Sequence, residues 1–89
     1  MNKELLQELN TLYANELVDL VVKLIYAEDS EDFETADALN KHINILIDNT
    51  SITFSNIGGL PIDVVKENFT NGYFEILNKI RKAKDTLKL

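Results

Sequence analysis

Carboxylates crowded into one short stretch are the residues of this chain with the most evident chemistry. The stretch EDSEDFETAD, residues 28–37, holds six acids and no base, namely Glu28, Asp29, Glu31, Asp32, Glu34 and Asp37. Clustered oxygens suit a hard cation, and paired carboxylates can transfer protons when a concave site raises one pKa. The calcium-loop order is missing, because its sixth position from Asp29 is Glu34 rather than glycine and its twelfth is Asn40 rather than glutamate. We therefore interpret the stretch as a solvated turn or a partner-binding surface.

Few other side chains offer chemistry. The chain has no cysteine and one histidine, His42, which lies off the apolar side of its predicted helix. A catalytic triad needs a nucleophile beside the histidine, and Ser30, Ser51 and Ser55 stand in no nucleophile-bearing turn. We predict that the protein is not an enzyme, with no catalytic residues, no cofactor and no metal ion.

Length and charge narrow the class of protein. A chain of 89 residues folds as one domain, here residues 1–89, and can bury about 64% of its unfolded surface. The net charge of −6 opposes binding to nucleic acid, and no signal peptide or membrane-spanning stretch is evident. We expect a cytoplasmic protein that binds neither nucleic acid nor membrane. Abundant Asn, Ile and Lys beside a single Arg point to a low-GC bacterium or one of its mobile elements.

Apolar residues recur at helical spacing along most of the chain. Steps of three and four residues predict helices over about 3–28, 31–48 and 61–86. The sequence SITFSNIGGL alternates apolar and polar residues before two glycines, so we predict a structured loop at 49–60. Asn71 and Gly72 form a common turn pair, but the apolar phase crosses them unchanged and favours a continuous third helix.

These elements predict an all-α fold, a three-helix up-down-up bundle. Residues 1–60 carry 3 bases and 11 acids, whereas residues 61–89 carry 6 bases and 4 acids. In this topology the basic end of the third helix lies beside the acidic turn between the first two. The predicted core follows the apolar line of each helix and comprises Leu9, Leu17, Leu20, Leu24, Leu39, Ile43, Leu46, Val65, Phe69, Ile76 and Ile80.

The first and third helices carry more apolar residues than a narrow core face needs. The additional residues are Leu5, Leu12, Val18, Val22, Phe74 and Leu77. They either widen the core or form an exposed apolar groove for a partner helix or a second copy of the chain.

Two stretches resemble parts of known inhibitor families. Residues 16–32, ELVDLVVKLIYAEDSED, are similar to the first helix and acidic loop of the immunity proteins of nuclease colicins, which are small acidic helical inhibitors. ITFSNIGGLP stands where those proteins carry a D-L-I-aromatic-aromatic-P element. LIYAEDSED together with FTNGYF, residues 69–74, is similar to small anti-sigma factors of T-even phages. By analogy both imply a stoichiometric inhibitor, and neither resemblance assigns the chain to a family.

The sequence therefore predicts a small acidic protein-binding domain: an inhibitor, immunity or regulatory factor of bacterial or phage origin. Its partner is expected to be a protein with a basic surface that meets the six acids of residues 28–37. Two alternatives stay open. A homo-oligomeric structural or assembly protein, such as a homodimer, would bury the apolar surplus in copies of itself. A DNA mimic would need its acids spread along a face rather than gathered in one turn.

Overall fold

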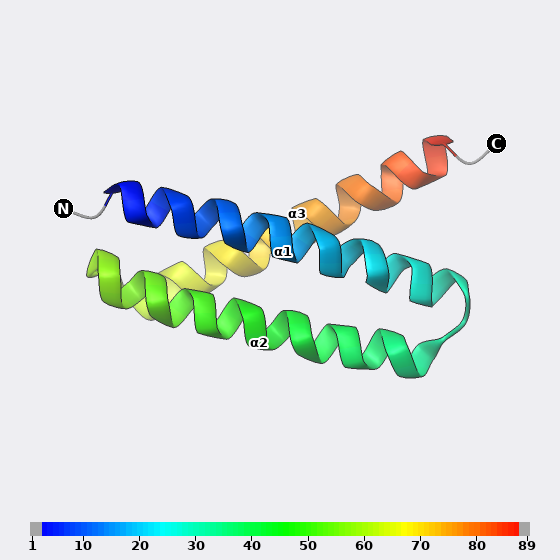
Figure 1. The fold of residues 1–89 in the computed structure, drawn as a ribbon, viewed down its shortest axis with the longest axis horizontal. Coiled ribbons are helices and arrows are strands. Elements are labelled where there is room, and N and C mark those ends of the chain that lie inside the picture. The colour runs from blue at the N-terminus through cyan, green and yellow to red at the C-terminus, as the bar shows by residue number, and fades with distance from the viewer. Residues whose placement is uncertain (1–2, 88–89) are drawn as a thin grey trace.

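Three long α-helices make up the chain in this computed structural model. The structure describes residues 3–87, with α1 over Lys3–Asp29, α2 over Phe33–Gly58 and α3 over Ile62–Leu87. The first two helices run antiparallel, and α3 crosses behind both toward the turn that joins them (Figure 1). The predicted all-α, three-helix, up-down-up fold is confirmed, and α3 continues across Gly72 without a break.

The end of α2 departs from the sequence-based expectation. The sequence predicts a loop over 49–60, but the helix continues through Gly58. The loop prediction is wrong. Position 51 is fully buried but carries a polar serine, so the apolar periodicity stops there although the helix continues. Within this part of α2 the hydroxyl of Thr53 is satisfied locally, since its Oγ1 donates to the carbonyl of Asn49 at 3.0 Å.

The second of two adjacent glycines, Gly59, supplies the stop signal of α2, which ends at Gly58. Gly59 adopts the left-handed conformation with φ of 64°, and its backbone N–H donates to the carbonyl of Ser55. The amide of Leu60 donates to the same carbonyl at 3.2 Å, and the hydroxyl of Ser55 donates to the carbonyl of Leu60. These bonds satisfy the helix end and turn the chain toward α3.

The core lies between the three helices and contains the predicted residues. Leu17, Leu24 and Ile43 are fully buried, and every other predicted core residue is buried or half-buried. Leu77, predicted beside the main line of α3, is buried as well. Phe33 lies on the apolar line predicted for α2, yet it is 67% exposed because it is the first residue of that helix, at the end of the bundle.

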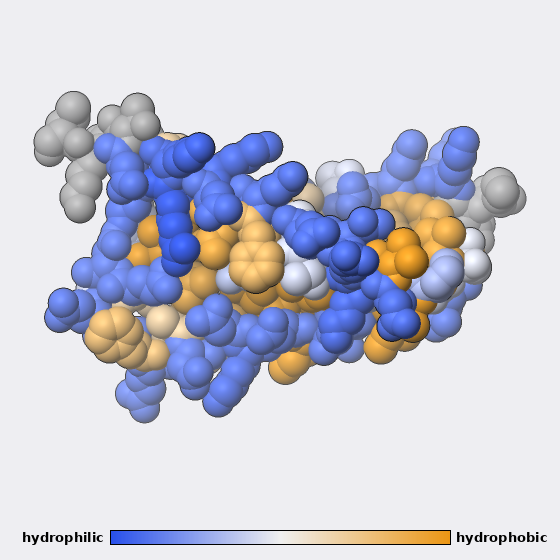
Figure 2. Space-filling view, turned by 180° about the vertical axis from the view of Figure 1, so that it is seen from behind, coloured by the Kyte–Doolittle hydropathy of each residue, from blue (hydrophilic) through white to orange (hydrophobic). Residues whose placement is uncertain are grey.

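The molecule is elongated and exposes much apolar surface. It measures 48 × 26 × 18 Å, and its radius of gyration is 14.5 Å, against about 12 Å for a compact domain of this length. Apolar side chains gather at the end where α1 begins, α2 ends and α3 begins, and a second group lies toward the opposite end (Figure 2). The most exposed large apolar residues are Leu5, Leu12, Val18, Tyr26, Phe33, Ile45, Ile52, Leu60, Ile62, Val64 and Phe74. None of the helices over residues 3–87 is long and apolar enough to cross a membrane.

Truncating one buried leucine tests this core. Leu20 is 5% exposed in the middle of α1, so Leu20→Ala should lower the free energy of unfolding by about 2–5 kcal/mol, through lost burial and the cavity left behind. Ile45 is 57% exposed, so Ile45→Ala should stay within about 0.5 kcal/mol of the wild type. Urea unfolding followed by circular dichroism measures both values. Equal losses for the two variants would contradict this core.

Candidate functional site

The acidic stretch forms the end of α1, the turn and the start of α2. The amide of Ser30 donates to the carbonyl of Tyr26, and the amide of Asp32 donates to that of Ala27 at 2.9 Å. Glu31 takes the left-handed conformation with φ of 57°. This sharp reversal brings acids from two helices and their connection to one end of the bundle.

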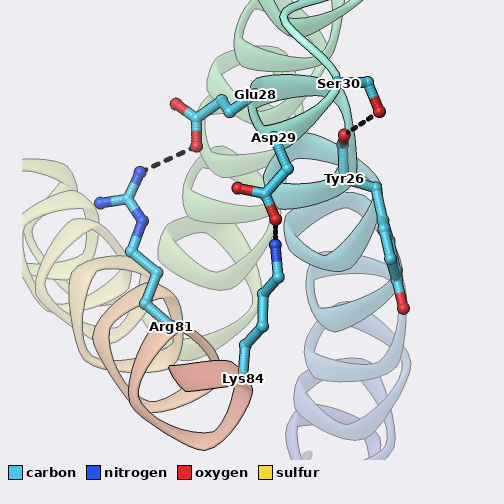
Figure 3. Close-up of polar contacts among 6 residues, drawn as sticks. All are labelled: Tyr26, Glu28, Asp29, Ser30, Arg81 and Lys84. Carbon is cyan, nitrogen blue, oxygen red and sulfur yellow. Dashed lines mark hydrogen bonds and ion pairs between the residues drawn. The ribbon is translucent and has the colours of Figure 1, made fainter. Parts of the chain in front are cut away.

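The basic end of α3 reaches this turn, as the charge distribution predicts. Nη2 of Arg81 lies 2.9 Å from Oε1 of Glu28, and Nζ of Lys84 forms an ion pair with Asp29 (Figure 3). Lys84 also lies over the ring of Tyr26, with its Nζ 5.7 Å from the ring centroid. These contacts fix the end of α3 to the end of α1.

Two further acids have partners within the turn or the next helix. The carboxylate of Asp32 accepts hydrogen bonds from the hydroxyl of Thr35 at 2.7 Å and from its backbone amide at 3.2 Å, and so caps α2. These bonds lower the pKa of Asp32 below its usual value, and the bond from the Thr35 hydroxyl has the larger effect. Asp37 pairs with Lys41 at 3.1 Å along α2. Glu31 and Glu34 form no ion pair with another described residue.

The six predicted site residues are therefore brought together, but four of them already have contacts within the chain. Their proposed contact with a partner stays a prediction. Among residues 3–87, no group of three or more histidine, cysteine or acidic side chains is arranged to hold a metal ion. His42 is exposed as expected, with its Nε2 4.0 Å from Oε1 of Glu16.

A second candidate surface is an open groove between the first half of α1 and the second half of α2. It has a volume of about 210 Å³ and is lined by Leu9, Leu12, Tyr13, Glu16, Leu46, Asn49, Thr50, Thr53 and Phe54. The sequence left open an apolar groove on the first and third helices that would include Leu12, whereas this groove lies between α1 and α2. The α2 wall was missed because residues 49–60 were predicted as a loop.

Aromatic rings support the floor of this groove. The ring of Phe69, on α3, makes edge contacts with Tyr13 at 4.7 Å and with Phe54 at 5.0 Å between centroids. All residues lining the groove belong to α1 and α2, so α3 supports the floor without taking part in the opening. The hydroxyl of Tyr13 is buried without a hydrogen-bond partner, and burial raises the pKa of Tyr13 to about 12.

No protein-family model matches this chain, and no curated protein or solved structure shows significant similarity to it. The fold and the two surfaces therefore carry the functional argument by themselves.

The ion pair between α1 and α3 can be tested by a double-mutant cycle. Glu28→Gln and Arg81→Gln should show a favourable coupling energy below about 1 kcal/mol, because both side chains remain partly exposed to water. The coupling should weaken as salt is added. Lys79→Gln combined with Glu28→Gln serves as the control on the same helix. A coupling at low salt no larger than the control's would show that the pair does not hold α3 to the turn.

Tyr13→Phe tests the unpartnered hydroxyl. Removing a buried group without a hydrogen bond should leave stability at neutral pH unchanged or raised. The pKa of Tyr13 rises from 10.0 to about 12 on folding, so the unfolded chain loses this proton first. Wild-type stability should therefore fall between about pH 10 and 12, and Tyr13→Phe should remove that part of the fall. Tyr26→Phe, at an exposed position, is the control in pH-dependent unfolding. A Tyr13→Phe variant that is less stable at neutral pH would reveal a bond to this hydroxyl.

Proposed function

We propose that this chain is a non-catalytic protein-binding domain that acts by forming a stoichiometric complex. In this proposal it is an inhibitor, immunity or regulatory factor of bacterial or phage origin. The observation that carries the proposal is the apolar surface that the three helices leave uncovered. The negative net charge and the all-helical fold of the chain also suit the small acidic inhibitors that residues 16–32 resemble.

The uncovered surface is large enough to form an interface. The accessible surface is 6399 Å², whereas a compact monomer of 10.1 kDa has about 5,300 Å². The surplus of about 1,100 Å², polar and apolar surface together, is comparable with the roughly 800 Å² that each partner buries in a standard protein complex. Monomeric proteins rarely keep large connected apolar patches in water, so these patches support a protein partner.

The net charge favours a different protein over a second copy of the chain. Two copies each carry −6 and repel each other, whereas a basic protein is attracted. In the acidic turn, Glu31 and Glu34 are the acids that can meet such a partner without breaking an ion pair or a helix-capping hydrogen bond of the described chain. Attraction of this kind raises the association rate and weakens with salt.

Sedimentation equilibrium and affinity capture test the proposal together. The purified chain should sediment as a monomer over a wide range of concentration. Immobilised chain should capture a specific protein from lysates of low-GC bacteria, with or without phage infection, and the purified pair should form a complex of fixed stoichiometry. Glu31→Gln with Glu34→Gln should slow association and flatten its salt dependence, with stability unchanged.

Two results would contradict the proposal. A concentration-dependent oligomer that buries the exposed apolar residues would favour the homo-oligomeric assembly protein. A monomer that forms no complex above the level seen with an unrelated acidic helical protein would leave the chain without the proposed activity. If the Glu31→Gln, Glu34→Gln variant associates as fast as the wild type at every salt concentration, the acidic turn would be ruled out as a contact, while the protein-binding function would stand.

A further inference from the structure

We propose that the groove between α1 and α2 binds an amphipathic α-helix of a partner protein, with basic residues flanking the apolar side of that helix. This inference rests on the proposed protein-binding function and gives it a site and a kind of ligand. It places the main contact away from the acidic turn, at the opposite half of the α1–α2 pair.

The groove has the composition of a helix-binding site. Its floor is apolar, formed by Leu9, Tyr13, Leu46 and Phe54, and Leu12 stands at its edge with 65% of its surface exposed. The other lining residues of α2 are the uncharged polar residues Asn49, Thr50 and Thr53. An apolar floor between polar walls matches a helix that presents apolar side chains at positions i, i+3, i+4 and i+7.

The supported floor gives the groove a fixed shape. Phe69 packs its ring against both Tyr13 and Phe54, so α3 holds the two aromatic side chains in place. Binding to a preformed surface costs little ordering entropy, which favours a ligand that is itself a regular helix.

Acidic side chains flank the groove along α1. Glu16 lines the groove, while Glu4 and Glu8 line an adjoining hollow that shares Leu12. His42 approaches Glu16 from α2, and no lysine or arginine among residues 3–87 lines either hollow. The second half of α2 carries a single acid, Asp48, which pairs with Lys66 of α3 at 2.8 Å. The glutamates along this rim, Glu4, Glu8 and Glu16, therefore favour a bound helix with lysine or arginine on either side of its apolar face.

The same charges argue against a second copy as the occupant. A second groove would bring its own Glu4, Glu8 and Glu16 into contact with the first. In the basic helix α3, Arg81 and Lys84 are already paired with the acidic turn of their own chain. A copy that docks groove to groove therefore meets like charge at these glutamates, whereas a basic helix meets opposite charge.

Titration with a defined peptide tests the site. The probe is a fluorescein-labelled helical peptide of leucine and lysine, with leucines at the spacing given above, and its counterpart has glutamate in place of each lysine. The lysine peptide should bind with one-to-one stoichiometry and the glutamate peptide should not. In NMR spectra of ¹⁵N-labelled protein, the largest chemical-shift changes on adding the lysine peptide should occur at groove residues Leu9, Leu12 and Thr53.

Matched variants separate the groove from the rest of the surface. Leu12→Asp should weaken lysine-peptide binding by about tenfold or more, the effect of losing one apolar anchor. Ile45→Asp is the control, since Ile45 is 57% exposed and lies outside the groove. Glu8→Gln with Glu16→Gln should weaken binding and flatten its salt dependence. Circular dichroism and thermal unfolding confirm that each variant is folded.

Three outcomes would overturn the groove as the site. The first is equal binding by the Leu12→Asp and Ile45→Asp variants. The second is a set of shift changes confined to residues 28–37, which would return the contact to the acidic turn. The third is shift changes at the groove that depend on protein concentration alone, which would show a second copy as occupant. If the chain still captures a protein through another surface, the groove fails while the protein-binding function stands.

Discussion

Helix length is the constraint on which the rest of this structure depends. The three helices have 27, 26 and 26 residues, so each is about 40 Å long, in a chain of only 89 residues. A bundle of three such rods is narrow, and its core is a strip rather than a sphere. Many apolar side chains beside this strip, Leu12 and Phe74 among them, find no helix to cover them. The exposed apolar surface is thus a geometric result of the fold.

The two ends of the bundle differ in how their side chains are stabilised. At the turn between α1 and α2, acids are close together, and Arg81, Lys84 and the hydrogen bonds to Asp32 compensate the repulsion. At the other end little charge is paired between helices, and apolar side chains are exposed (Figure 2). The turn end is therefore held by ion pairs and capping bonds within the chain, whereas the other end is held mainly by apolar packing, and apolar side chains are exposed toward both ends.

Much of the fold could be predicted because apolar periodicity is a direct signal of helix faces. Leu17, Leu24 and Ile43 lie on these faces and are buried, and the opposite charge of the chain ends placed Arg81 near the acidic turn. The second half of α2 could not be predicted, because the buried Ser51 carries no apolar signal. The groove depends on that segment and on contacts between distant residues, such as the ring of Phe69 against Phe54, which spacing along the chain does not encode.

The short connections of this bundle bear on how the chain reaches its structure. Only residues 30–32 and 59–61 separate the helices, so neighbours in sequence are neighbours in space. Closing such short loops costs little chain entropy, and helical proteins with mostly local contacts fold in microseconds to milliseconds. Both walls of the groove belong to the first 58 residues, a single helical hairpin, and Phe69 of α3 completes its floor. A complete chain therefore spends little time with its core side chains exposed to aggregation before the bundle closes.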